Sequence, residues 1–169
     1  MADRGRVRRS ELSRLLPWLG LAVRLVAAGI WIFAGAAKLA DLEQFKTQVA
    51  AYDVLPHAVV APFAYTLPFV ELALGLYLAF GFLVRPASAV ATLLMAIFIA
   101  AEAQAWARGL NLECGCFGTV VKQQVGPWTI VRDVALGLPT LVLLARPARR
   151  LSLDGRLLRL PDRFAPLET

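Results

Sequence analysis

The stretch PWLGLAVRLVAAGIWIFAGAA, residues 17–37, decides the fold of this chain. It is apolar apart from Arg24, and about 20 such residues form a helix that crosses a hydrocarbon core of about 30 Å. Its end, Phe33-Ala34-Gly35-Ala36-Ala37, resembles a signal-peptide cleavage site. The run is longer than the 7–15 apolar residues of a usual signal peptide, so we expect a retained membrane anchor.

Similar apolar runs recur further along the chain. With the first they predict an all-α integral membrane protein, a bundle of four transmembrane helices. The predicted spans are 17–37, 59–84, 86–106 and 128–145, with Arg85-Pro86 as a tight turn. A polar connector joins the first two spans and carries Phe45, Val49 and Tyr52 at helical spacing. The predicted division is a basic tail at 1–16, a transmembrane domain at 17–145 and a basic tail at 146–169.

Composition supports a membrane protein and argues against a nucleic-acid partner. Hydrophobic residues make up 59% of the chain, against about 45–50% in soluble domains. The net charge is +6, but the basic residues cluster just outside the apolar runs, as membrane topology requires. The side of the termini carries twelve of them and the other side five. The positive-inside rule therefore predicts cytoplasmic termini in the plasma membrane and an extracytoplasmic loop between the last two spans.

That loop contains the sequence Leu112-Glu113-Cys114-Gly115-Cys116-Phe117-Gly118, with the two cysteines of the chain. A disulfide requires a turn between them, which Gly115 permits. Because so small a ring removes little entropy from the unfolded chain, the disulfide would stabilise the fold little. Strained disulfides are typically labile or catalytic. We favour a redox-active pair. The alternatives are two reduced cysteines in a tight turn, or a metal-binding or partner-dependent role. A metal is not expected, since His57 is the only histidine and no second cysteine pair exists.

Ionisable residues inside membrane helices are costly and suggest function. Each predicted span has a stripe of small, polar or charged residues at helical spacing, which predicts an inward face. The charged members singled out as pocket or site-tuning residues are Lys38, Glu71, Glu102, Arg132 and Asp133. The structural interpretation is buried ion pairs, Lys38 with Glu71 and Arg132 with a carboxylate. The functional interpretation is a polar pocket beneath the cysteines that favours a thiolate and relays protons.

Several motifs together resemble the DoxX-like membrane proteins, and most closely the MauE (methylamine utilisation) branch. They are Gly35-Ala36-Ala37-Lys38-Leu39, Tyr52-Asp53-Val54-Leu55-Pro56, Leu67-Pro68-Phe69-Val70-Glu71-Leu72, Cys114-Gly115-Cys116-Phe117-Gly118 and Arg132-Asp133. This resemblance covers roughly residues 20–145. It implies a role in maturation or export of the disulfide-rich small subunit of methylamine dehydrogenase.

The expected function is that of a membrane thiol–disulfide oxidoreductase, with Cys114 and Cys116 as the exchanging residues. Electrons would pass between an extracytoplasmic thioredoxin-like partner and a membrane acceptor, for which quinone is the expected class; no covalently bound cofactor is expected. Lys38, Glu71 and Arg132 would tune the site or line a quinone pocket. The alternative is a non-catalytic assembly or docking subunit with a structural cysteine pair. Small-molecule transport is disfavoured, because four spans without an evident repeat leave little room for alternating access.

Overall fold

The computed structural model describes residues 3–118 and 123–146, and in this part of the chain five helices account for most of the fold. Their bounds are α1 (Asp3–Leu39), α2 (Leu42–Ala51), α3 (His57–Phe80), α4 (Val84–Ala107) and α5 (Pro127–Ala145). Four stretches, Pro17–Leu39 of α1 and the whole of α3, α4 and α5, are long and apolar enough to cross a membrane. The predicted four-helix membrane bundle is confirmed. The tail predicted at 146–169 lies, from residue 147 on, outside the described residues.

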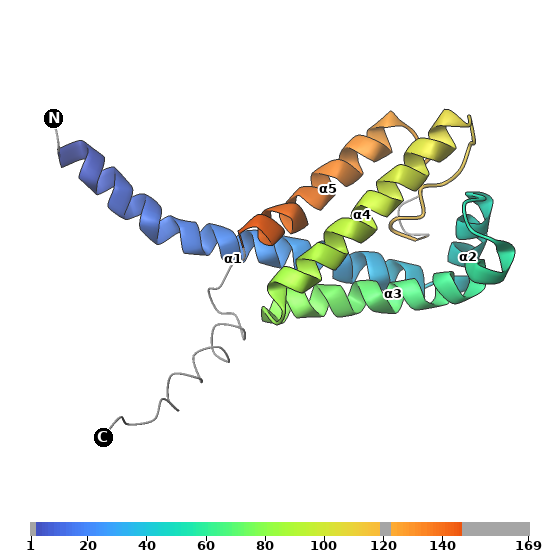
Figure 1. The fold of residues 1–169 in the computed structure, drawn as a ribbon, viewed down its shortest axis with the longest axis horizontal. Helices are drawn as coiled ribbons and strands as arrows, with labels where there is room; N and C mark the ends of the chain where they lie inside the picture. Colours follow the sequence, from blue (N-terminus) through green and yellow to red (C-terminus); the bar gives the residue numbers. More distant parts are fainter. Residues whose placement is uncertain (1–2, 119–122, 147–169) are drawn as a thin grey trace, which may run out of the picture.

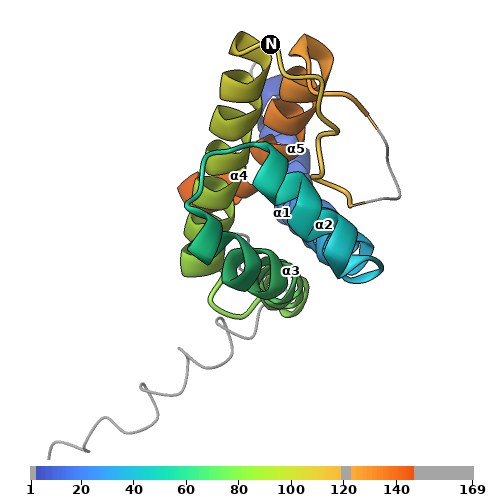
Figure 2. The ribbon, with the colours of Figure 1, turned by 90° about the vertical axis from the view of Figure 1, so that its right-hand side faces the viewer.

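The helices form an elongated bundle in which α1 packs against α3 and α5, and α4 packs against α5 and α3. The N-terminal part of α1 extends away from the other helices (Figure 1), so residues 3–16, predicted as a tail, continue the first helix. At the opposite end, α2 lies across the bundle near the loop that follows α4 (Figures 1 and 2). The predicted connector is thus a helix, and it lies close to the cysteine-containing loop.

The turn between α3 and α4 is displaced from its predicted position at Arg85-Pro86. Helix α3 ends at Phe80, and the chain turns at Gly81 and Leu83, whose φ angles are 67° and 49°. Glycine at this position closes a helix without the steric cost of a side chain. Pro86 falls in the first turn of α4, where its missing N–H would have no intrahelical partner in any case.

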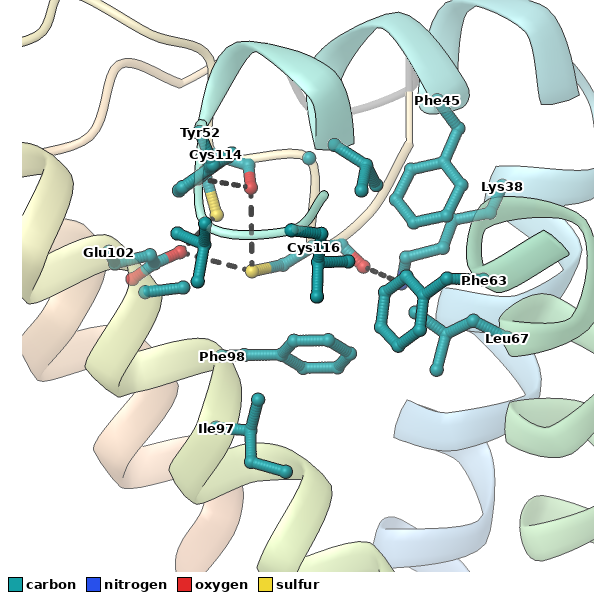
Figure 3. Close-up of a pocket in the computed structure, with 15 residues that line it drawn as sticks. Lys38, Phe45, Tyr52, Phe63, Leu67, Ile97, Phe98, Glu102, Cys114 and Cys116 are labelled. Atoms are coloured by element: carbon teal, nitrogen blue, oxygen red, sulfur yellow. Dashed lines mark hydrogen bonds between the residues drawn. The ribbon is translucent and has the colours of Figure 1, made fainter. Parts of the chain in front are cut away.

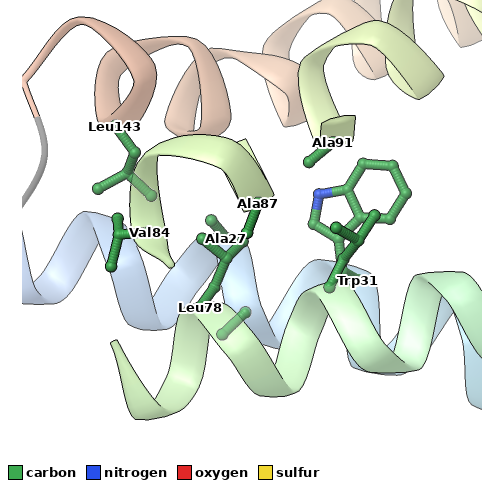
Figure 4. Packing of buried hydrophobic residues seen from close by; sticks show 9 residues of the cluster. Ala27, Trp31, Leu78, Val84, Ala87, Ala91 and Leu143 are labelled. Carbon is green, nitrogen blue, oxygen red and sulfur yellow. The ribbon is translucent and has the colours of Figure 1, made fainter. Parts of the chain in front are cut away.

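The predicted inward stripes are buried over most of their length. A central apolar cluster joins Ala27 and Trp31 of α1, Leu78 of α3, Ala87 of α4 and Leu143 of α5 (Figure 4). Trp106 follows Glu102 by four residues, and this helical spacing predicts that it also faces inward, but Trp106 is 53% exposed. The next buried residue after Glu102 is Ala105, three residues later. Trp106, four residues after Glu102, therefore faces outward.

Large apolar side chains cover much of the outer surface of the bundle. Phe69, Phe80, Leu93 and Val131 are all more than half exposed. A soluble protein rarely exposes an apolar surface of this extent, whereas a lipid environment solvates it. The outer surface therefore agrees with a multi-pass membrane protein.

Two glycines allow α1 and α3 to approach each other closely. A Cβ atom on Gly35 would lie 2.7 Å from the carbonyl oxygen of Pro68, and one on Gly75 would lie 2.8 Å from the backbone nitrogen of Ile32. Small residues at such crossings bring helix backbones together in membranes. The crossing matters for the site, because it fixes the distance between Lys38 on α1 and Glu71 on α3.

We predict that Gly75→Ala destabilises the bundle, because the added methyl group meets backbone atoms that cannot move independently. The expected loss is about 1–3 kcal/mol, as for overpacking elsewhere, measured as a lower midpoint of thermal unfolding in detergent. Gly29→Ala is the matched control on α1, since a Cβ atom there has nothing within 4 Å. It should leave stability unchanged or raise it by up to about 1 kcal/mol. Equal effects of the two substitutions would contradict the close crossing.

Candidate thiol site at one end of the bundle

The Cys-Gly-Cys-Phe-Gly stretch of the loop between α4 and α5 turns at its two glycines. Gly115 and Gly118 have φ angles of 71° and 55°, a region that side chains strongly disfavour. A Cβ atom on Gly118 would also lie 2.5 Å from the carbonyl oxygen of Ala37. Downstream, the backbone nitrogen of Cys114 donates to the carbonyl oxygen of Gln123 at 2.8 Å. The Cys-Gly-Cys-Phe-Gly sequence is therefore a tight turn laid directly against the end of α1.

The turn places both thiols between two carboxylates from different helices. The sulfur of Cys114 lies 2.6 Å from Oε1 of Glu102, and that of Cys116 lies 3.0 Å from the same oxygen and 2.9 Å from Oδ2 of Asp133. Glu102 and Asp133 are almost fully buried, on α4 and α5. Both cysteines are free thiols. Each thiol proton thus has a carboxylate oxygen within hydrogen-bonding distance.

Arg132 supplies a positive charge to the same cluster. Its Nε donates to Oδ1 of Asp133 at 2.7 Å, and its Nη2 donates to the sulfur of Cys114 at 3.1 Å. Nη1 is held by the side-chain oxygen of Gln123, and the guanidinium lies 5.2 Å from the ring centroid of Phe117. Four contacts fix this side chain, so its charge stays beside Cys114. The predicted pairing of Arg132 with a carboxylate is confirmed.

The two thiols have different acidities. A hydrogen bond from the Cys116 thiol is the main cause that lowers the pKa of Cys114 to about 6, against the opposing effect of burial. The pKa of Cys116 is raised well above its usual value, because it gives that hydrogen bond and because the surrounding protein partly desolvates its thiol. The pair therefore loses its first proton much more easily than its second. A thiol of lowered pKa beside an arginine is typical of reactive cysteines.

Lys38 connects this turn to the core of the bundle. Its Nζ donates to both oxygens of Glu71 at 2.9 Å and to the carbonyl oxygen of Cys116 at 2.6 Å. An ammonium group has three donors, and these three acceptors use all of them. Lys38 and Glu71 are 2% and 1% exposed, so the predicted buried ion pair is confirmed. It also anchors the backbone of the turn, which was not predicted.

Helix α2 covers the turn from the other side. The hydroxyl of Tyr52, just beyond the helix, donates to the carbonyl oxygen of Cys114 at 2.9 Å. Gln48 donates to the carboxylate of Glu113 at 3.1 Å. The carbonyl oxygens of both cysteines thus accept a side-chain hydrogen bond, that of Cys114 from Tyr52 and that of Cys116 from Lys38. The sequence indicates that Tyr52 shares a helix face with Phe45 and Val49. Its contact with Cys114 was not predicted.

An apolar pocket of about 310 Å³ lies beside the thiols. Aromatic rings from α2, α3 and α4 line it, namely Phe45, Phe63 and Phe98, and its polar end is formed by Lys38, Glu102 and both cysteines (Figure 3). Of the residues expected to line such a pocket, Lys38 does so. Glu71 and Arg132 are not among the lining residues and instead contact Lys38 and Cys114, respectively. Both thiol-bearing residues therefore border an apolar cavity.

The structure brings all seven residues predicted for the site to one end of the bundle. They form two linked groups, the Lys38–Glu71 pair under the turn and the cluster of Glu102, Arg132, Asp133 and the two thiols. Sequence reasoning missed the contributions of Gln123 and Phe98. Neither lies in a motif, and only the packing of distant segments places them here.

Comparison with known proteins gives one family. The family described as "Methylamine utilisation protein MauE" matches this chain over residues 16–146. The MauE protein of Paracoccus denitrificans is 33% identical over 121 residues, which cover 71% of this chain and 65% of that protein. The MauE protein of Methylophilus methylotrophus is 32% identical over 133 residues, which cover 78% of this chain and 70% of that protein. The chain thus spans about two thirds of the length of these curated relatives. No solved structure matches it.

Proposed function

This chain belongs to the MauE family, and from that premise we propose that it is a membrane thiol–disulfide oxidoreductase acting in maturation of exported proteins. The curated relatives carry names that refer to methylamine utilisation. By that kinship the proposed client is an exported disulfide-rich protein such as the small subunit of methylamine dehydrogenase. The observation that carries the proposal is the placement of two free thiols within hydrogen-bonding distance of two buried carboxylates and an arginine.

The chemistry uses groups already in contact. When the Cys114–Cys116 bond forms, two thiols lose two protons and two electrons, and the sulfurs close from within 4.8 Å to about 2.05 Å. Glu102 and Asp133 are placed to take the protons, and Arg132 is placed to stabilise the thiolate of Cys114. When the pair oxidises a client, a client thiolate attacks one sulfur, a mixed disulfide forms, and a second client thiol releases the reduced pair.

The proposed electron acceptor on the membrane side is a quinone. A pocket of about 310 Å³ falls within the range of small-molecule sites, and the rings of Phe63 and Phe98 offer apolar faces to a planar ring. A quinone bound there would accept the two electrons and two protons that the dithiol releases. Glu102 touches both the sulfurs and the pocket, so it is placed to pass a proton from one to the other.

The proposed orientation places the turn outside the cytoplasm. The excess of basic residues on the side of the termini supports this orientation, and disulfides persist in extracytoplasmic compartments. A thioredoxin-like partner would meet the turn from that side, where Cys116 is partly exposed. Cys116 also lines the apolar pocket proposed for the acceptor.

The proposal is tested by the reduction potential of the pair. Purified full-length protein is equilibrated with thiol–disulfide buffers of set potential, and its free thiols are counted after alkylation. We expect a reversible two-electron transition above about −300 mV, the range below which structural disulfides usually lie. Cys114→Ser is the control and should show no such transition within one chain. Failure of the wild-type pair to form an intrachain disulfide at any potential would contradict the proposal.

A further inference from the structure

The cluster of Glu102, Cys114, Cys116 and Asp133 also has the donor set of a metal site. One ligand atom from each residue, two sulfurs and two carboxylate oxygens, lies within 4.8 Å of all the others. The four donors come from α4, the cysteine turn and α5, so the fold rather than a local motif gathers them. Glu102 and Asp133, from separate helices, supply the two ligands that the lack of further histidines and cysteines had left missing.

A second observation points to a missing ligand at this place. Glu102 is 1% exposed, and its Oε2 atom has no hydrogen-bond partner among the described residues, while Oε1 contacts both sulfurs. Buried carboxylate oxygens are nearly always satisfied. Here the second oxygen of a carboxylate directed at two thiols has no partner, and a cation bound between the four residues and held by both oxygens of Glu102 would satisfy it.

We propose that the reduced cysteine pair, together with Glu102 and Asp133, binds one divalent cation of the zinc class. Thiolate ligands disfavour Mg²⁺ and Ca²⁺, and two sulfurs with two oxygens suit the tetrahedral preference of Zn²⁺. Zn–S bonds of about 2.3 Å and Zn–O bonds of about 2.1 Å separate neighbouring ligand atoms by roughly 3.4–3.8 Å. The sulfur–oxygen contacts of 2.6–3.0 Å would lengthen by less than about 1 Å.

The surroundings of the cluster suit a bound cation. Two thiolates and two carboxylates carry four negative charges, which Zn²⁺ and Arg132 together reduce to one. Arg132 holds Asp133 through Oδ1 at 2.7 Å, which leaves Oδ2 directed at the thiols; such outer contacts orient metal ligands in other proteins. Binding releases the thiol protons to solvent and transfers no electrons.

This inference does not depend on the redox function. A dithiol that never cycles would bind the cation equally well, whereas the disulfide has no thiolates to offer. Cation binding and disulfide formation therefore exclude each other. If both occur, the cation protects the reduced pair from oxidation.

The test uses the full chain in detergent, reduced and freed of metal by a chelator that is then removed. We expect Zn²⁺ to bind with a stoichiometry of one in calorimetry, and Co²⁺ to give the visible absorption of a tetrahedral site with thiolate ligands. Glu102→Gln and Asp133→Asn should each weaken Zn²⁺ binding by at least the roughly 10–100-fold that outer-shell changes cost. Glu113→Gln is the matched control, since this carboxylate lies on the same loop and contacts Gln48.

Oxidised and reduced wild-type protein are compared in parallel, so the test does not rely on variants that fold poorly. The oxidised protein should bind no Co²⁺ at this site, and reduction should restore binding. The proposal is overturned if the reduced wild-type protein binds no stoichiometric Zn²⁺. It is equally overturned if well-folded Glu102→Gln and Asp133→Asn proteins bind Zn²⁺ as tightly as Glu113→Gln, which would leave the thiols as the sole ligands. The reduction potential measured without metal is unaffected by either outcome.

Discussion

Replacing Lys38 by alanine is expected to lower the free energy of unfolding by about 3–5 kcal/mol, the usual cost of leaving one member of a buried ion pair unpaired. The substitution leaves the carboxylate of Glu71 without its two hydrogen bonds at 2.9 Å. It also removes the donor to the carbonyl oxygen of Cys116. Glu71→Ala should cost a similar amount, because it leaves a buried ammonium group without its counter-charge. The measurement is thermal or denaturant unfolding of the detergent-solubilised protein.

The double variant Lys38→Ala/Glu71→Ala should lose less than the sum of the single losses, because neither buried charge then remains. Lys46→Ala is the matched control, since Lys46 pairs with Glu43 near the surface of α2 and its loss should change stability little. Additive losses at Lys38 and Glu71 would mean that the two residues do not interact, and would remove the main anchor of the cysteine turn.

Replacing either cysteine by serine is expected to abolish function in cells while the protein remains folded. The chemical reason is that a single thiol cannot form the intrachain disulfide on which transfer depends. The physical reason for intact folding is that so short a ring contributes little chain entropy and that both cysteines are already free thiols in the fold. Function is measured by complementation of a deletion strain, with the oxidised fraction of the exported client protein as the readout. Folding is measured as the midpoint of thermal unfolding of the purified variant.

Glu113→Gln, on the same loop, should keep full complementation and serves as the control. A Cys114→Ser/Cys116→Ser protein that folds and complements fully would remove the redox proposal. The assembly or docking subunit would then be the better account of the bundle.

The membrane fold could be predicted because its main signals are local. Runs of apolar residues set the spans, and the hydrophobic thickness of the bilayer sets their length. The Lys38–Glu71 pair could be predicted as well, since a buried lysine and a buried glutamate on neighbouring helices have few other ways to offset their desolvation. The turn at Gly115 followed from the spacing of the cysteines alone.

What the sequence could not supply depends on contacts between distant segments. Glu102 and Asp133 were expected near the cysteines. For both carboxylates to contact the same two sulfurs, α4 and α5 must also pack with these two residues at the same level of the bundle. The contact between Tyr52 and Cys114 requires α2 to lie across the end of the bundle. The outward position of Trp106 depends on a difference of one residue along the inward stripe of α4, which periodicity alone does not resolve.

The proposed function requires Cys114 and Cys116 to cycle between thiols and a disulfide on the extracytoplasmic side. The most direct measurement is redox-state trapping in intact cells, with acid quenching and alkylation to preserve the pair, and a membrane-impermeant thiol reagent to locate it. We predict that a pulse of reductant opens the disulfide, that the freed thiols react with the impermeant reagent in whole cells, and that the disulfide re-forms after the reductant is removed. Thiols that stay reduced throughout, or that react with the impermeant reagent only after lysis, would contradict it.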